Sequence, residues 1–194
     1  MIDNFKQIKT LLEFPNDDVY YHLQILRRGK DHPELPAANR MIKAYFICSL
    51  EGLDYVEEEI KDLCKFFKAR AYINLSPKSI KKTSALQMKY LAQRIYEGDY
   101  KKIWKSWNTC AGEIKGLSPR WIVDIDGCNS STELDDIENF INSLQPEGSN
   151  KIIDEIPTLS GFHIITSPFN IQQFKEKYPD IDVHRNNPTV LYIS

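Results

Sequence analysis

The feature that most constrains the fold is residues 121–126, an apolar run that carries aspartate at two alternate positions. Successive side chains on a β-strand point to opposite faces of a sheet, so Asp124 and Asp126 would share one face while Ile125 points to the other. Gly127 follows directly and ends the pattern. The sequence therefore predicts a strand that packs one face into a core and presents two carboxylates on the other.

Helical and strand-like patterns interleave along the rest of the chain, without an internal repeat. Helical spacing and capping signals predict helices at residues 4–12, 49–69, 76–96, 100–111, 130–144 and 170–178. Runs rich in β-branched and aromatic residues predict further strands at residues 19–28, 42–48, 70–75, 151–156, 162–166 and 189–193. Ser49 and Ser130 are the predicted caps of two helices. This pattern is typical of an α+β (α/β) protein with a mixed β-sheet flanked by helices.

Charge is distributed unevenly along the chain. Residues 1–119 hold 20 basic and 15 acidic side chains, whereas residues 120–194 hold 5 basic and 12 acidic ones. A basic surface beside an acidic cluster suits a polyanion that also needs a metal ion, while a solvated helix face rich in lysine is the alternative. We expect one domain over residues 1–194, or else two lobes, a basic one at 1–116 and a second at 117–194 that carries the paired aspartates.

The sequence has no feature of a secreted or membrane protein. Its four cysteines lie far apart, which favours free thiols over a disulfide framework or a zinc site. No run approaches the roughly 18 apolar residues that a membrane-spanning helix needs, and no signal-peptide pattern is found. We therefore expect a cytoplasmic protein without a membrane partner.

The paired aspartates predict a metal site. Two carboxylates this close on one strand face repel each other unless a cation lies between them. Mg²⁺ or Mn²⁺ takes oxygen ligands, retains several waters and leaves room for substrate phosphates. We therefore interpret Asp124 and Asp126 as metal ligands, and polar residues that meet solvent at a strand end are the alternative.

A second group of polar residues opens the strand predicted at 162–166. Ser160 and His163 supply a hydroxyl and an imidazole that can hydrogen-bond a phosphate, and Gly161 allows the backbone to approach a ligand closely. A structural histidine is the alternative for His163 taken alone. The Asp-x-Asp strand, a helix and then Ser-Gly-x-His follow one another in the chain. We therefore expect Asp124 and His163 on neighbouring strands of one sheet, with their side chains opening into the same cleft.

This order of motifs resembles the archaeo-eukaryotic primase superfamily, the primase-polymerases, over roughly residues 40–193. The resemblance implies an RRM-like catalytic core for DNA replication in which Asp124, Asp126 and His163 are catalytic. Asp124 and Asp126 would bind the two metal ions used in nucleotidyl transfer. Ser160, Gly161 and His163 would contact the phosphates of the incoming nucleotide triphosphate.

The resemblance extends, more loosely, to other parts of the chain. It implies a third metal-binding carboxylate, for which Asp182 is our choice over Asp180. Arg70 and Lys78, in an upstream strand and basic turn, would add charge for the phosphates or for a single-stranded DNA or RNA template. Template bases could stack on Tyr100, Trp104 or Trp107, although core packing is the alternative for these rings.

Two alternatives to a primase-like enzyme remain open. One is a non-catalytic nucleic-acid-binding module that assists replication. The other is a phosphatase of the haloacid dehalogenase type, with Asp124 as nucleophile, Asp126 as acid/base, Thr166 in its Ser/Thr strand, and Lys175 or Lys177 as its lysine. Cys128 stands where such a phosphatase usually has threonine.

Overall fold

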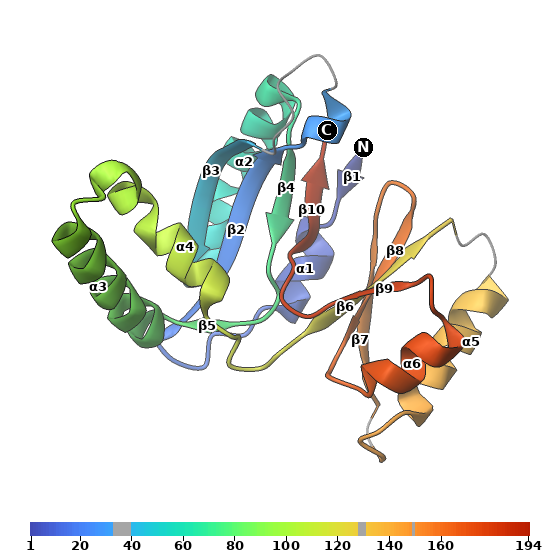
Figure 1. Cartoon of the computed structure of the whole chain (residues 1–194). Coiled ribbons are helices and arrows are strands. Elements are labelled where there is room, and N and C mark those ends of the chain that lie inside the picture. The colour runs from blue at the N-terminus through green and yellow to red at the C-terminus, as the bar shows by residue number, and fades with distance from the viewer. Residues whose placement is uncertain (33–39, 128–130, 149) are drawn as a thin grey trace.

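The computed structural model describes residues 1–32, 40–127, 131–148 and 150–194, and its described strands form two sheets (Figure 1). The first sheet has the order β1 (Ile2–Asp3), β10 (Thr189–Ile193), β4 (Arg70–Ile73), β2 (Val19–Arg27) and β3 (Arg40–Ile47), and β5 (Lys78–Ser79) pairs with β2. The second sheet has the order β7 (Ile152–Pro157), β8 (Gly161–Thr166), β6 (Trp121–Asp126) and β9 (Asp182–His184). The α+β class is confirmed.

The expected single mixed sheet is wrong, because the described strands form two sheets in which every pairing is antiparallel. The helix α5 (Ser131–Ser143) joins β6 to β7, but β8 lies between these two strands. The helix α6 (Ile171–Lys177) joins β8 to β9, with β6 between them. Each crossover therefore passes over a strand that runs in the opposite direction, so parallel strands are never neighbours.

One face of the first sheet is covered by α1 (Phe5–Leu11) and α2 (Leu50–Phe67). Alternation along β2 packs Tyr21, Leu23 and Ile25 into the core beneath these helices. The intervening residues point to the opposite face, which is left to meet the second sheet and α4. The helix α2 begins where the sequence predicts, because the Ser49 hydroxyl accepts a hydrogen bond from the Gly52 amide.

The second sheet and its two helices follow the order β6–α5–β7–β8–α6–β9, a split βαβ arrangement. Val123, Ile125 and Ile164 point toward α5 and α6 and pack there against Ile141 and Phe174. The other face is turned to the first sheet, and Ile122, Ile156 and Ile165 join the core of that sheet. The predicted helix cap Ser130 and Cys128, for which a free thiol was predicted, lie outside the described residues.

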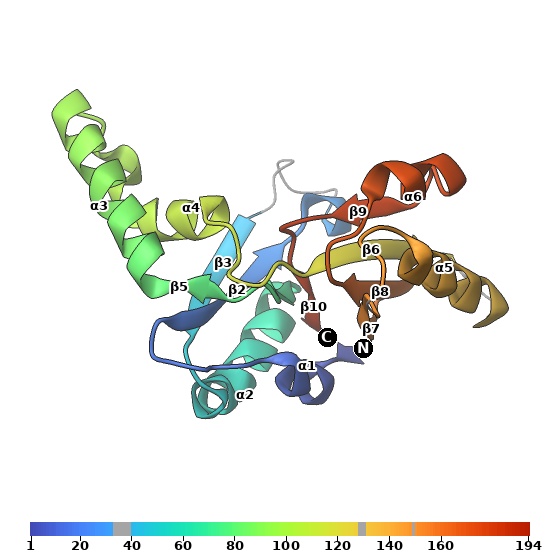
Figure 2. The same cartoon turned by 90° about the horizontal axis from the view of Figure 1, so that it is seen from below.

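A helical arm extends from one side of the first sheet (Figures 1 and 2). It consists of α3 (Ile80–Glu97), η2 (Tyr100–Lys105) and α4 (Ser106–Glu113), and a short turn, η1 (Gly29–Asp31), follows β2. The helix α3 begins three residues later than predicted, because Ser79 pairs with β2 and caps the helix in place of Ser76. Among the described residues, no helix is both long and apolar enough to cross a membrane.

Candidate active site between the two sheets

Asp124 lies at the centre of a group of polar residues on the face of β6 that is turned to the first sheet. It pairs with His163 on β8 and with Asp182 on β9. Directly paired residues of antiparallel strands point to the same face, so these three side chains share one side of the sheet. His163 Nε2 lies 3.4 Å from Asp124 Oδ1, and His184 Nε2 lies 3.9 Å from Asp124 Oδ2. The prediction that Asp124 and His163 lie on neighbouring strands and open into one cleft is confirmed.

A residue of the first sheet, Thr189, fixes the orientation of the His163 ring. Its Nδ1 atom lies 2.8 Å from the hydroxyl oxygen of Thr189, which is fully buried at the start of β10. The side chain of His163 itself is only 12% exposed. One ring nitrogen therefore faces the first sheet while the other faces Asp124.

Ser160 and Gly161 meet the other aspartate of the strand. The Ser160 hydroxyl donates a hydrogen bond to Asp126 Oδ1 over 2.5 Å, and Gly161 pairs with Asp126 across the sheet. A Cβ atom on Gly161 would lie 1.9 Å from the carbonyl oxygen of Ile125. The close approach that this glycine permits is therefore between β8 and the backbone of β6.

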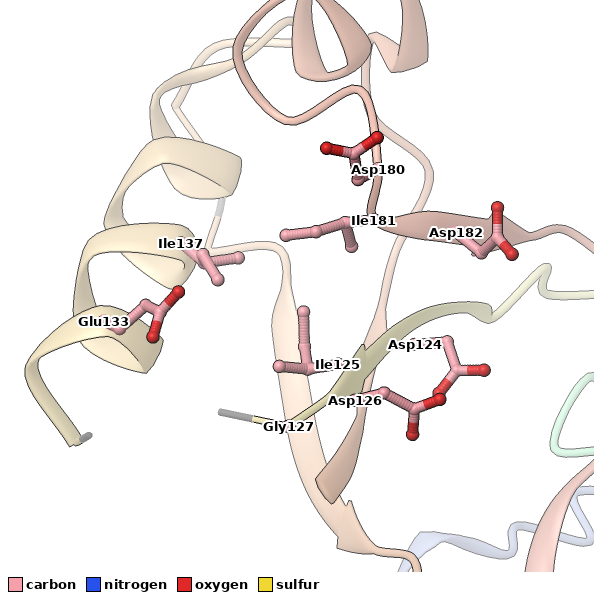
Figure 3. A pocket seen from close by; sticks show the side chains of 9 residues that line it. All are labelled: Asp124, Ile125, Asp126, Gly127, Glu133, Ile137, Asp180, Ile181 and Asp182. Atoms are coloured by element: carbon pink, nitrogen blue, oxygen red, sulfur yellow. The ribbon is translucent and has the colours of Figure 1, made fainter. Parts of the chain in front are cut away.

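Figure 3 shows Asp124 and Asp126 side by side on β6, with Asp182 on the adjacent strand. They line a pocket of about 250 Å³ with two further carboxylates, those of Glu133 and Asp180. None of the described residues that line this pocket is basic, although Asp182 Oδ1 lies 3.7 Å from Lys175 Nζ. The described residues include no group of three or more His, Cys, Asp or Glu side chains in an arrangement that could hold a metal ion. The donor chemistry, carboxylate oxygen throughout, is that which Mg²⁺ and Mn²⁺ prefer.

A second pocket, of about 230 Å³, lies between the two sheets. The second sheet contributes Asp124, His163 and His184 to it, and the first contributes Arg28 and Tyr72. Asp124 lines both pockets. Sequence reasoning missed Arg28, Tyr72 and His184, because alternation along a strand identifies a face but does not identify which distant strand faces it.

Two predicted phosphate-binding residues lie elsewhere. The Arg70 guanidinium is paired with Asp31, with 2.6 Å between Nη2 and Oδ1, and lines a separate pocket beside Ser194. The Lys78 ammonium donates to the carbonyl oxygen of Ile114 over 2.8 Å, and the residue is 1% exposed. Burial lowers the pKa of Lys78 to about 8. The described contacts therefore do not bring Arg70 and Lys78 to the group around Asp124: pairing of β5 with β2 buries Lys78, and an ion pair with Asp31 holds Arg70 at another pocket.

The three aromatic residues proposed to stack bases divide into two kinds. The Trp107 ring lies 6.0 Å from the Tyr20 ring and 5.6 Å from the Phe46 ring, measured between centroids, so it belongs to a packed cluster. Trp104 is 77% exposed and Tyr100 is 59% exposed. Of the three, only Tyr100 and Trp104 are exposed enough to meet a ligand.

Comparison with protein-family models, with curated proteins and with solved structures finds no match to this chain. Its function is therefore inferred from the residues of the two pockets.

Proposed function

We propose that this chain catalyses metal-dependent nucleotidyl transfer, as a DNA or RNA primase or a primase-polymerase does. The observation that carries the proposal is the position of Asp124, which has His163 opposite it on β8 and Asp182 opposite it on β9. Asp126 follows on the same face. The primase-polymerase resemblance assigns metal binding or phosphate binding to these four residues. The strand and helix order of the second sheet also supports an RRM-like core.

Asp124, Asp126 and Asp182 are the residues that would hold Mg²⁺ or Mn²⁺. The ion, when bound, supplies charge stabilisation to the reacting phosphates and activates the attacking hydroxyl. His163 donates a hydrogen bond to the nucleotide phosphates, and its contact with Thr189 holds the ring in position. Ser160 links the metal-binding aspartates to the phosphate-binding residues, because its hydroxyl contacts Asp126.

In the phosphatase alternative, the hydroxyl of Thr166 would have to lie near the nucleophile, Asp124. Thr166 pairs with Trp121, three positions along β8 from His163. An odd separation on a strand turns the side chain to the opposite face, so the Thr166 hydroxyl points away from Asp124. We therefore do not propose a phosphatase.

The test is the double variant Asp124→Asn, Asp126→Asn. We expect nucleotide incorporation on a single-stranded template with Mn²⁺ to fall roughly a hundredfold or more, because several kcal/mol of charge stabilisation would be lost. Calorimetric titration should show that saturable Mn²⁺ binding disappears. Thermal melts in chelator should show an intact or slightly more stable fold, because neutral side chains relieve the repulsion between two adjacent carboxylates.

The matched control is Asp135→Asn, Asp136→Asn, which makes the same charge change at exposed positions of α5. This control should keep both incorporation and Mn²⁺ binding. A parent protein that binds no Mn²⁺ even with nucleotide present would overturn the enzyme proposal. Template binding without incorporation would favour the accessory module.

A further inference from the structure

Arg28 and Tyr72 form the wall of the inter-sheet pocket that faces Asp124. Arg28 directly follows β2, and Tyr72 lies on the neighbouring strand β4. The Arg28 guanidinium donates a hydrogen bond from Nη1 to the Tyr72 hydroxyl over 3.2 Å. Tyr72 is only 8% exposed and both residues line the pocket, so this hydrogen bond supports the guanidinium there.

The charge of Arg28 is not compensated within the described residues. No ion pair joins Arg28 to a carboxylate there, in contrast to Arg70, which is paired with Asp31. The acidic residue of the same pocket, Asp124, has two imidazoles as its neighbours. A partly buried cation without a carboxylate partner is stabilised when an anionic ligand binds beside it.

The chemistry of the pocket suits a phosphate as this anion. A guanidinium presents a planar fork of donors that matches two phosphate oxygens at once. The two histidines of the pocket can add ring N–H donors from the opposite wall. The adjoining acidic pocket repels anions, so a phosphorylated ligand would orient its phosphate toward Arg28.

We propose that Arg28, held by Tyr72, binds a phosphate group of the nucleotide in the pocket between the sheets. Arg28 would thus perform the role that the sequence suggested for Arg70 and Lys78. The identity of the ligand as a nucleotide rests on the proposed function, whereas phosphate binding rests on the pocket alone.

The test uses pyrophosphate as the probe, in chelator and without nucleotide, measured by calorimetry or by the rise in melting temperature. We expect saturable binding to the parent and affinity lower by about ten- to a hundredfold in Arg28→Gln, because a charge-assisted fork is lost. Tyr72→Phe, which removes only the supporting hydroxyl, should weaken binding several-fold.

The matched control is Arg27→Gln. It makes the same charge change at the adjacent residue, but Arg27 lines a different pocket with Arg40 and Phe67. Its affinity for pyrophosphate should stay within about twofold of the parent, since only distant, screened charge is removed. Equal losses in Arg27→Gln and Arg28→Gln, or a folded parent that binds no pyrophosphate, would overturn the proposal.

Two further measurements separate this inference from folding defects and from the proposed enzyme activity. If Arg28→Gln does not fold, Arg28→Lys keeps the charge without the fork and should bind pyrophosphate several-fold more weakly than Arg27→Lys. Equal affinities of these two variants would again overturn the proposal. Pyrophosphate should also bind to the Asp124→Asn, Asp126→Asn variant. Pyrophosphate binding by a parent protein that incorporates no nucleotide would refute the transferase and retain the phosphate site.

Discussion

His22 lies on the face of β2 opposite α1 and α2, where its ring stacks on Phe46 with centroids 5.4 Å apart. Its Nε2 atom lies 3.2 Å from Asn108 Oδ1, and burial lowers its pKa to about 4. The unfolded chain would take up a proton near the ordinary pKa of about 6.5. The neutral ring therefore contributes stability that is present above about pH 6.5 and is lost as the pH falls toward about 4, at most about 3 kcal/mol.

Urea unfolding at about pH 7 and about pH 4.5 checks this expectation. Gln in place of His22 keeps a donor for Asn108 but cannot titrate in this range, so His22→Gln should lose less stability than the parent on acidification. The other titratable groups are common to both proteins, so the difference between the two proteins in the stability lost on acidification isolates His22. Equal losses of stability would show that His22 is not held neutral by burial.

The pairing of strands β6 and β8 depends on one residue, Gly161. Gly161 lies where β8 approaches Ile125, and an added Cβ would overlap the backbone of β6. Gly161→Ala should therefore force the strands apart and lower the free energy of unfolding by about 1–3 kcal/mol. Because His163 follows two residues later, the same shift should weaken Mn²⁺-dependent incorporation.

A second glycine provides the control for this element. Gly112 lies in α4, and nothing lies near the position of its missing Cβ. Gly112→Ala should be neutral or stabilising by up to about 1 kcal/mol, because alanine favours a helix. Denaturant unfolding curves of the two variants measure both effects. A Gly161→Ala protein as stable as the parent would contradict the assigned strand contact.

At the scale of the whole molecule, the arm offers basic and aromatic side chains while the acidic pocket lies on the second sheet. Lys81 and Lys82 are exposed at the start of α3, and Tyr100 and Trp104 are exposed on η2. We expect a single-stranded oligonucleotide to bind here, with affinity that falls as salt rises. Lys81→Glu with Lys82→Glu should weaken binding to all sequences alike and flatten the salt dependence, as measured by fluorescence anisotropy.

Lys78 is excluded from this prediction because it is buried. Lys6→Glu with Lys65→Glu provides the control, since these exposed lysines belong to α1 and α2 on the far side of the first sheet. The control should bind the oligonucleotide almost as well as the parent does. If the two double variants behave alike, or the parent does not bind at low salt, the arm is only a solvated helical surface.

Much of the local structure could be predicted from consecutive residues. The alternation that ends in Asp124 and Asp126 predicted β6, and Ser49 predicted the start of α2. Spacing and caps act through backbone groups a few residues apart, so they can be read from a short stretch of chain. The pairing of Asp124 with His163 was also predicted, although the chain passes through α5 and β7 between their strands, so that β8 reaches β6 by a hairpin from β7 and not by one helical crossover.

Only the tertiary structure determined which basic side chain lies in the pocket with Asp124. Arg70, Lys78 and Arg28 all lie in or beside strands of the first sheet, and no local pattern distinguishes them. Pairing of β5 with β2 buries Lys78, an ion pair with Asp31 holds Arg70 away, and the packing of the two sheets brings Arg28 to Asp124. Strand pairing and sheet packing join residues far apart in the chain, and their energies depend on the partner surface as much as on the strand itself.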